Sequence, residues 1–202
     1  LETYRDSVYT QMFNDPPRKP EIWDYLPNGE WVITWCVGRL VTMSYNAKCD
    51  EKLKFWRLDT LPFIPGEFKY EVIPQVEKQY EIIKGLFQRE DRDTIYVSTD
   101  SGREGEYIYR LVDQMIGIEG KEKKRIWIDS QTEEEIRRGI EQAKSQSEYD
   151  SLSDSAYLRA KEDYLIGINF SRLLTIIYGR RMASKINEDK ATISVGRVMT
   201  CV

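Results

Sequence analysis

The sequence predicts an α/β fold, in which helices flank a parallel sheet and a mainly helical segment follows. Between residues 76 and 144, short apolar stretches typical of strands alternate with amphipathic stretches typical of helices. This alternation indicates a doubly wound parallel sheet. The chain of 202 residues is 41% hydrophobic, which is enough for a core and excludes collagen-like, coiled-coil and disordered chains.

The first third of the chain is predicted to hold one strand and little other regular structure. Residues 31–37 are apolar at successive positions, the pattern of an inner strand that is covered on both faces, and Gly38 ends it. Residues 15–20 are rich in proline and predict a loop. Residues 44–74 contain Trp, Phe and Pro without helical periodicity, so we expect an extended loop that packs through its aromatic side chains.

Helices and strands alternate in the central region. Apolar residues recur at helical spacing over residues 76–87, and residues 95–99 form a short strand whose following turn leads into an amphipathic helix. Residues 125–129 are predicted as the next strand. Thr132 begins the helix after it, in a capping box where Glu135 reaches back to the cap.

A polar segment separates this region from a long helix. Residues 145–155 are almost all polar and predict a linker, which divides the chain into domains at residues 1–148 and 149–202. The long helix extends over residues 157–178. We expect it to stop at Gly179, because glycine is common just beyond a helix C-terminus.

Composition restricts the chemistry and the location. The chain contains no histidine, which excludes His-based triads, His metal ligands and His general bases. Its three cysteines, Cys36, Cys49 and Cys201, suggest neither a zinc site nor a disulfide framework, so reduced thiols are expected. No stretch has the pattern of a membrane span or a signal peptide, and we therefore expect a cytoplasmic location and no membrane partner.

Charge is unevenly distributed along the chain. The net charge of −4 argues against non-specific nucleic-acid binding by the whole surface. Residues 151–202, however, carry eight Lys and Arg against five Asp and Glu, while residues 1–150 are acidic overall. Two functional surfaces of opposite charge are expected.

The turn after residues 95–99 contains the most informative residues. Ligands of open parallel sheets bind at the carboxyl ends of the strands, where Asp100 and Glu104 stand. Carboxylates in this place can hold a hard cation such as Mg²⁺, or they can simply complement the dipole of the following helix. A plain phosphate cradle is disfavoured, because neither glycine-rich nucleotide motif is present and the carboxylates repel phosphate.

Several segments, taken in order, resemble motifs of one enzyme family. Residues 99–106, TDSGREGE, resemble the TDxDREGE signature of the TOPRIM domain in type IA DNA topoisomerases, especially the topoisomerase III branch. Residues 31–40 resemble its WxxTWxxGHL segment and residues 61–65 its LPxxP segment. Residues 159–172 resemble its RAxxDWLxGxNxSR helix, and residues 194–198 its SVGRV segment.

The resemblance implies a Rossmann-like TOPRIM sheet followed by the start of a helical single-strand-binding domain. It also implies Mg²⁺ as cofactor, single-stranded DNA as partner, and a reaction in which a tyrosine cleaves one strand, another strand passes, and the break is resealed. Catalytic and metal-binding roles would fall to Asp100, Glu104 and Glu2. Cationic side chains of the basic last quarter would contact phosphates, unless they lie on a solvated helix face. The DNA-binding residues that the resemblance implies are Arg103, Arg159, Asn169, Arg172, Ser194 and Arg197.

The chain departs from the family pattern at several positions. Gly102 stands where the family has the second Asp of its DxD pair, so weaker metal binding or a different ligand set is expected. Arg39 stands where the family has His. Met199 and Cys201 replace the Gln and Pro of the last motif.

None of the tyrosines lies in a motif that matches the family's nucleophile. The resemblance therefore implies an N-terminal fragment of a longer topoisomerase, monomeric and inactive by itself, whose catalytic tyrosine lies in the remainder of its own polypeptide. One alternative is a non-catalytic single-stranded nucleic-acid-binding module, which Gly102 makes possible. Another is a different TOPRIM enzyme, a primase or a nuclease, which shares the carboxylate turn but not the other motifs. Metal dependence discriminates the enzyme from the binding module.

Overall fold

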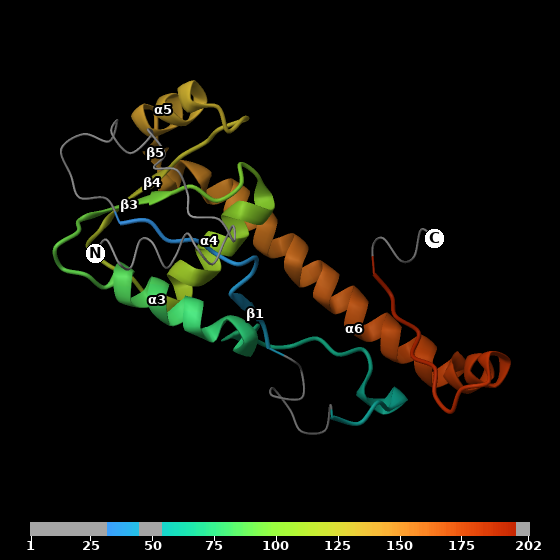
Figure 1. Cartoon of the computed structure of the whole chain (residues 1–202). Helices are drawn as coiled ribbons and strands as arrows, with labels where there is room; N and C mark the ends of the chain where they lie inside the picture. The colour runs from blue at the N-terminus through green and yellow to red at the C-terminus, as the bar shows by residue number, and fades with distance from the viewer. Residues whose placement is uncertain (1–31, 45–53, 197–202) are drawn as a thin grey trace. The chain divides into compact units, whose positions relative to one another are not determined.

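The computed structural model describes residues 32–44 and 54–196, which form two compact units (Figure 1). The first unit comprises the described residues up to Val41 together with Val72–Ser151. The second comprises the described residues of Thr42–Glu71 and those from Leu152 onward. The division predicted between residues 148 and 149 stays a prediction.

A three-stranded sheet, in the order β3-β4-β5, forms the centre of the first unit. Strand β3 (Thr94–Val97) pairs in parallel with β4 (Glu122–Arg125), and Thr94 lies opposite Glu122. Strand β5 (Lys144–Ser145) pairs with β4 in the antiparallel direction. The α/β class is therefore confirmed. The predicted parallel sheet is wrong in part, because among the described strands of this sheet β3 and β4 pair in parallel whereas β4 and β5 pair in the antiparallel direction.

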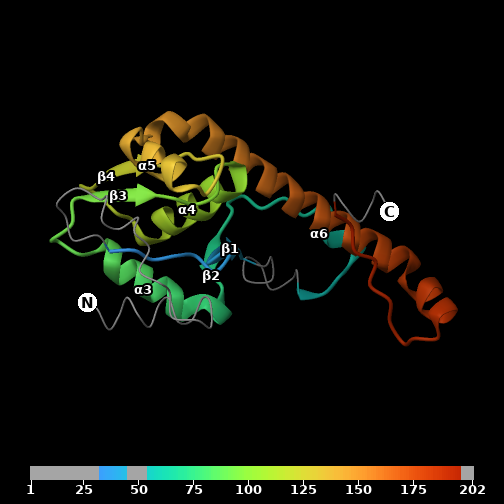
Figure 2. The same cartoon turned by 45° about the horizontal axis from the view of Figure 1, so that its top comes forward.

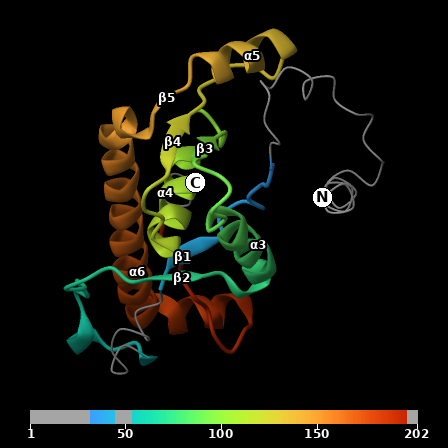
Figure 3. The same cartoon turned by 90° about the vertical axis from the view of Figure 1, so that its left-hand side faces the viewer.

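Helix α4 (Arg103–Ile116) connects the two parallel strands and lies alongside them, as Figures 1, 2 and 3 show from different sides. Its apolar face is buried at Tyr107, Leu111 and Val112. Gly117 ends the helix with a φ of 69°, a left-handed conformation that costs glycine little. This strand–helix–strand unit agrees with the periodicity of the sequence.

Two further helices complete the first unit. Helix α3 (Glu77–Phe87) begins within one residue of the predicted start and buries Tyr80 and Ile83. Helix α5 (Glu133–Glu141) begins after Thr132, as predicted, but the capping box does not form. Thr132 contributes no capping hydrogen bond, and the Glu135 carboxylate instead accepts from the backbone N–H of Asp129. The Glu135 carboxylate thus bonds to the preceding loop and to Arg138 of its own helix.

Both predicted strands outside β3 are displaced. The described part of the predicted strand at residues 31–37 is not a strand, and strand β1 (Val41–Met43) lies beyond it, paired with β2 (Tyr70–Val72). Instead of a strand ladder, the carbonyl of Trp35 receives a hydrogen bond from the side chain of Gln79 on α3. The strand predicted at residues 125–129 ends at Arg125, because its partner β3 ends opposite it at Val97.

The predicted polar linker is also wrong. A 3₁₀ turn (Gln146–Tyr149) leads directly into helix α6 (Asp150–Ile186), so residues 145–155 are largely helical. The helix also continues through Gly179, where the backbone carbonyl of Ala191 approaches so closely that a Cβ atom would lie 2.9 Å from it. Asn187, with a φ of 55°, follows the end of the helix instead.

In the second unit, residues 54–71 pack against α6 through aromatic rings, which agrees with the predicted aromatic packing, but the predicted loop of residues 44–74 is wrong at Tyr70–Val72, which form strand β2. Phe68 meets Tyr164 edge to face at 6.1 Å between ring centroids, and Tyr70 meets Tyr157 at 6.3 Å. Phe63 is buried. Among the helices that the structure describes, none combines the length and apolar character needed to cross a bilayer.

Candidate divalent-cation site at the start of helix α4

The candidate site lies where β3 gives way to α4, at the carboxyl end of a parallel strand. Asp100 and Glu104 are both exposed there. The N–H of Gly102 donates to the carbonyl of Asp100 at 2.8 Å, and the hydroxyl of Thr99 donates to the carbonyl of Gly105 at 2.8 Å. These bonds close a tight turn and present both carboxylates to solvent near the helix N-terminus, which favours negative charge.

Gly105 allows the backbone of Asp100 to pack tightly against the start of α4. A Cβ atom at residue 105 would lie 2.1 Å from the carbonyl oxygen of Asp100, a distance that real Cβ atoms do not show. The Asp100 backbone therefore packs directly on the first turn of α4. Only glycine permits this approach.

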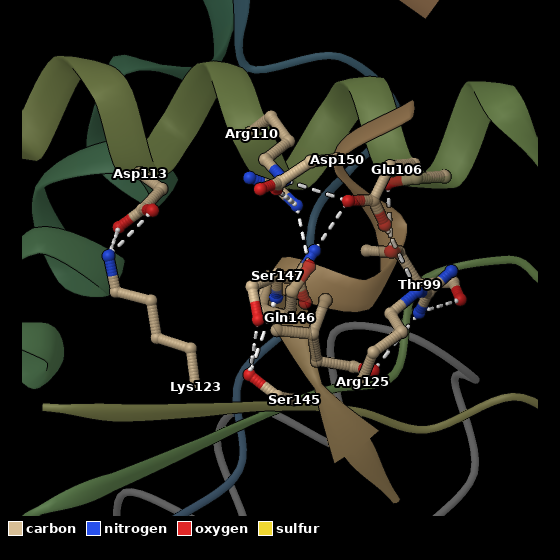
Figure 4. Close-up of polar contacts among 12 residues, drawn as sticks. Thr99, Glu106, Arg110, Asp113, Lys123, Arg125, Ser145, Gln146, Ser147 and Asp150 are labelled. Carbon is tan, nitrogen blue, oxygen red and sulfur yellow. Dashed lines mark hydrogen bonds and ion pairs between the residues drawn. The ribbon is translucent and has the colours of Figure 1, made fainter. Parts of the chain in front are cut away.

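Arg125, at the end of β4, holds the same turn from the other side (Figure 4). Its guanidinium donates to the carbonyls of Val97 at 3.0 Å, Thr99 at 2.7 Å and Asp100 at 2.6 Å. The side chain is fully buried, and burial lowers its pKa, an effect that the neighbouring Glu106 carboxylate opposes. A buried cation thus organises the backbone that carries Asp100.

Glu106 is the counter-ion of this buried arginine and has no exposed surface. One carboxylate oxygen lies 3.2 Å from Nε of Arg125, and the other accepts hydrogen bonds from Arg110 and Gln146. Arg110 continues the network to the carboxylate of Asp150 at 2.8 Å (Figure 4). Glu106 is therefore occupied by protein partners and is unsuited to binding a solvent cation.

The two candidate ligands differ in their surroundings. Nε of Arg39 lies 2.7 Å from a carboxylate oxygen of Glu104, with side-chain exposures of 49% and 59%. Within the part of the chain that the structure describes, the Asp100 carboxylate forms no hydrogen bond or ion pair. Glu104 thus already carries a cationic partner, and Asp100 is open.

These residues fit a Mg²⁺ ion that keeps most of its water. Their carboxylate oxygens are the ligands that a hard cation prefers. The positively charged guanidinium of Arg39 already lies against the Glu104 carboxylate, which shows that this carboxylate can bind a cation. No group of three Asp, Glu, Cys or His side chains suited to a metal is found among residues 32–44 and 54–196. One or two carboxylates with waters and phosphate oxygens suffice for Mg²⁺. Glu2, the third predicted ligand, lies outside the described residues.

The predicted DNA-binding residues are spread over both units. Arg103 is exposed on the first turn of α4, in the first unit. In the second unit, Arg159 is half-buried and Ser194 is exposed. Arg197 lies outside the described residues.

Asn169 and Arg172 occupy structural positions in the second unit. The amide of Asn169 donates to the carbonyl of Phe63 at 2.9 Å and accepts from its N–H at 2.6 Å, as a strand neighbour would. Arg172 is only 5% exposed, and its guanidinium lies 5.4 Å from the centre of the Trp56 ring. Burial lowers the pKa of Arg172. Both side chains tie residues 54–69 to α6.

Sequence reasoning missed the residues that organise the turn. Arg125 and Gln146 stand in polar stretches and carry no local pattern that indicates burial. The partnership of Arg39 with Glu104 spans 65 residues and has no sequence signal either. The acidic residues and the glycines of the turn did carry a readable pattern, since glycines at a strand-to-helix turn allow a tight backbone.

Comparison with known proteins identifies clear relatives. The chain is 36% identical over 176 residues to a protein of Bacillus subtilis (strain 168) named DNA topoisomerase 3, and equally to one of the same name from Staphylococcus aureus (strain MRSA252). The matched region is 87% of this chain and 23% of each relative, so the chain spans about a quarter of their length. No protein-family model matches the chain.

Proposed function

Because this chain is homologous over most of its length to the type IA enzymes named DNA topoisomerase 3, we propose that it supplies part of such an enzyme's DNA-cleaving machinery. The proposed part comprises a TOPRIM domain with its divalent-cation site and a portion of the groove for single-stranded DNA. The whole reaction is cleavage of one strand, passage of another and resealing. Its tyrosine nucleophile is assigned to no residue of this chain.

One structural observation supports the proposed cation site. The two exposed carboxylates of Asp100 and Glu104 lie on a turn whose backbone is held in place by close packing and hydrogen bonds. Gly105 and the buried Arg125 define that backbone. A preorganised turn keeps the carboxylates in place without paying the entropy of ordering at each encounter with a ligand. The observation favours a site that acts on a ligand over charges that only complement the helix dipole.

Each carboxylate has a proposed role. Asp100, which is open to solvent, is the primary oxygen ligand, and Glu104 completes the pair after releasing Arg39. A carboxylate of this pair that is not bound to the cation is proposed as the acid–base group that holds a proton for the departing DNA oxygen. Glu2 is proposed as the third ligand. Mg²⁺ bound by these groups would supply positive charge to the oxygens of a phosphodiester.

The second unit is proposed to guide the single strand. Residues 151–202 carry the basic excess of the chain, which attracts a polyanion. Ser194 and Arg159 of this unit have surface available for phosphate contacts, and Arg197 is proposed to add to them. Arg103 is proposed to contact phosphate separately, in the first unit. Asn169 and Arg172 would shape the groove by holding residues 54–69 on α6. A monomeric state and a cytoplasmic location stay predictions.

The alternative is a non-catalytic module that binds single-stranded nucleic acid. It is favoured by Gly102, which leaves the turn one carboxylate short of the family pattern. A primase or nuclease of the TOPRIM kind is disfavoured, because the relatives found over 87% of the chain carry the topoisomerase name.

Calorimetric titration of Mg²⁺, with a parallel measurement of fluorescent single-stranded oligonucleotide binding by anisotropy, tests the proposal. We expect Mg²⁺ to bind the chain, and Asp100→Asn with Glu104→Gln to abolish that binding. Glu119→Gln is the matched control, since this exposed carboxylate lies beyond the end of α4. Oligonucleotide binding without Mg²⁺ binding would favour the non-catalytic module. If the double variant binds Mg²⁺ as the parent does, the assignment of these carboxylates is wrong.

A further inference from the structure

We propose that Arg39 competes with the divalent cation for Glu104, so that it acts as a built-in counter-cation that weakens metal binding until it is displaced. The inference rests on the proposed function of the Asp100 and Glu104 pair. It assigns to Arg39 a role in setting the metal affinity of that site. Arg39 acts through Glu104 and is therefore a positioning residue.

The geometry places the guanidinium on one of the two Glu104 carboxylate oxygens that a metal could use. Nε of Arg39 donates to a carboxylate oxygen of Glu104 at 2.7 Å, a short, charge-assisted contact. Arg39 comes from the segment before β1, 65 residues away in sequence, so the contact is made by the fold and not by helix neighbours. An oxygen that accepts this bond directs its lone pair to the guanidinium. That lone pair is not free for a cation.

Tyr107 keeps the guanidinium near the turn. The Arg39 guanidinium carbon lies 5.6 Å from the centre of the Tyr107 ring, within the range of a cation–π contact. Tyr107 is 3% exposed and belongs to the buried face of α4, so the ring is a fixed support. Arg39 is thus held beside Glu104 by two contacts from one helix.

The ion pair is weak enough to be displaced. Both side chains are about half exposed, and exposed ion pairs contribute little net free energy because water and salt screen them. Metal binding through Oε1 of Glu104 therefore remains possible, but it must first break the pair. Arg39 lowers the affinity of the site without closing it.

The local charge balance acts in the same direction. Asp100 and Glu104 contribute two negative charges to the turn, while Arg39 and Arg103 contribute two positive charges. Loss of the Arg39 charge leaves the turn net negative and increases its attraction for Mg²⁺. Arg103, by contrast, forms no ion pair with Glu104 among the described residues. Arg103 is therefore a charge-matched control.

The test is Mg²⁺ titration by calorimetry into the parent chain, Arg39→Gln and Arg103→Gln, with circular dichroism to verify folding. We expect Arg39→Gln to lower the Kd for Mg²⁺ by about two- to fivefold, the range that corresponds to loss of an exposed ion pair. Arg103→Gln should lower it by a smaller factor. The excess of the first effect over the second measures the direct competition at Glu104.

A second readout follows Arg39 itself. The Nε–H signal of Arg39, identified by its absence in Arg39→Gln, should shift as Mg²⁺ is added to the parent chain. In the variant carrying Asp100→Asn, Glu104→Gln and native Arg39, Mg²⁺ should leave this signal unchanged. Equal Mg²⁺ affinity of the parent and Arg39→Gln, or equal effects of the two arginine substitutions, would overturn the inference while leaving the metal site intact. Absence of Mg²⁺ binding in every variant would overturn the proposed function and this inference with it.

Discussion

Replacement of Gly105 by alanine is expected to disrupt the turn that carries Asp100. The new Cβ would lie 2.1 Å from the carbonyl oxygen of Asp100, 2.7 Å from its nitrogen and 2.9 Å from its carbonyl carbon. All three are backbone atoms. Ordinary van der Waals contact begins at 3.4 Å, so the turn and the helix must move apart by about an ångström.

The magnitude follows from what holds those atoms. Overpacking costs about 1–3 kcal/mol where side chains can adjust. Here the Asp100 carbonyl is fixed by the buried guanidinium of Arg125, so we expect the upper end, about 3 kcal/mol. For a chain of this size, that loss lowers Tm by roughly 6–12 °C. The same displacement should weaken Mg²⁺ binding, because the Asp100 carboxylate moves with its backbone.

Gly102→Ala is the matched control on the same turn. A Cβ at residue 102 meets nothing within 4 Å, and its φ of 177° is extended backbone that any residue adopts. We expect its Tm to stay within about 2 °C of the parent value. Thermal unfolding followed by circular dichroism measures both variants. Equal stability of Gly105→Ala and Gly102→Ala would refute the close-packing explanation of the turn.

Four other substitutions or measurements test separate parts of the structure. Arg125→Met should lower the free energy of unfolding in urea by about 3–5 kcal/mol, because it removes the cation beside one oxygen of the buried Glu106 carboxylate and the donor to three backbone carbonyls. A loss below about 1 kcal/mol would contradict this. Asn169→Ala should cost about 1–3 kcal/mol through two lost backbone partners, whereas an unchanged urea midpoint would show that they contribute nothing. Burial raises the pKa of the Cys36 thiol to about 11. In a variant whose other two cysteines are serine, alkylation at pH 8 should therefore be roughly 100-fold slower than for a thiol of ordinary pKa, and its rate should increase up to about pH 11. A rate that levels off near pH 9 would contradict this. Gly102→Asp should tighten Mg²⁺ binding in calorimetry, since the open space there admits a third carboxylate, and an unchanged Kd would count against the ligand set.

The sequence was sufficient where local pattern and tertiary structure agree. The strand–turn–helix arrangement around Asp100 followed from an apolar run, a glycine-containing turn and helical periodicity, and the structure has β3 and α4 there. The aromatic packing of residues 54–69 was predictable for the same reason, because large rings in a loop need an apolar neighbour.

Long-range contacts explain what the sequence did not reveal. Gly179 has the sequence pattern of a helix C-terminus, but the helix continues through it, and the missing side chain allows the backbone carbonyl of Ala191 to pack closely. Local sequence rules do not predict such a long-range contact. Residues 32–37 have the composition of a strand, but one carbonyl in them receives its hydrogen bond from a helix side chain, that of Gln79. Strand formation depends on an available partner and not on composition alone.

In the candidate site, too, some residues could be predicted from the sequence and others could not. The carboxylates of Asp100 and Glu104 could be identified from their position after a strand, whereas the buried residues that hold the turn in place could not. Arg125 is fully buried although it ends a stretch of charged residues, because Glu106 and three backbone carbonyls receive it in the folded state. Such burial of an arginine is set by partners far apart in sequence.

The most direct test of the central claim is paramagnetic broadening of backbone amide signals by Mn²⁺, used as a probe for the Mg²⁺ site. We predict that the first signals to broaden belong to residues 100–105, and that an excess of Mg²⁺ restores them. Asp100→Asn with Glu104→Gln should remove the effect. Broadening that is centred instead on the acidic start of α5, Glu133–Glu135, and survives the double substitution would contradict the assignment of a divalent-cation site to this turn.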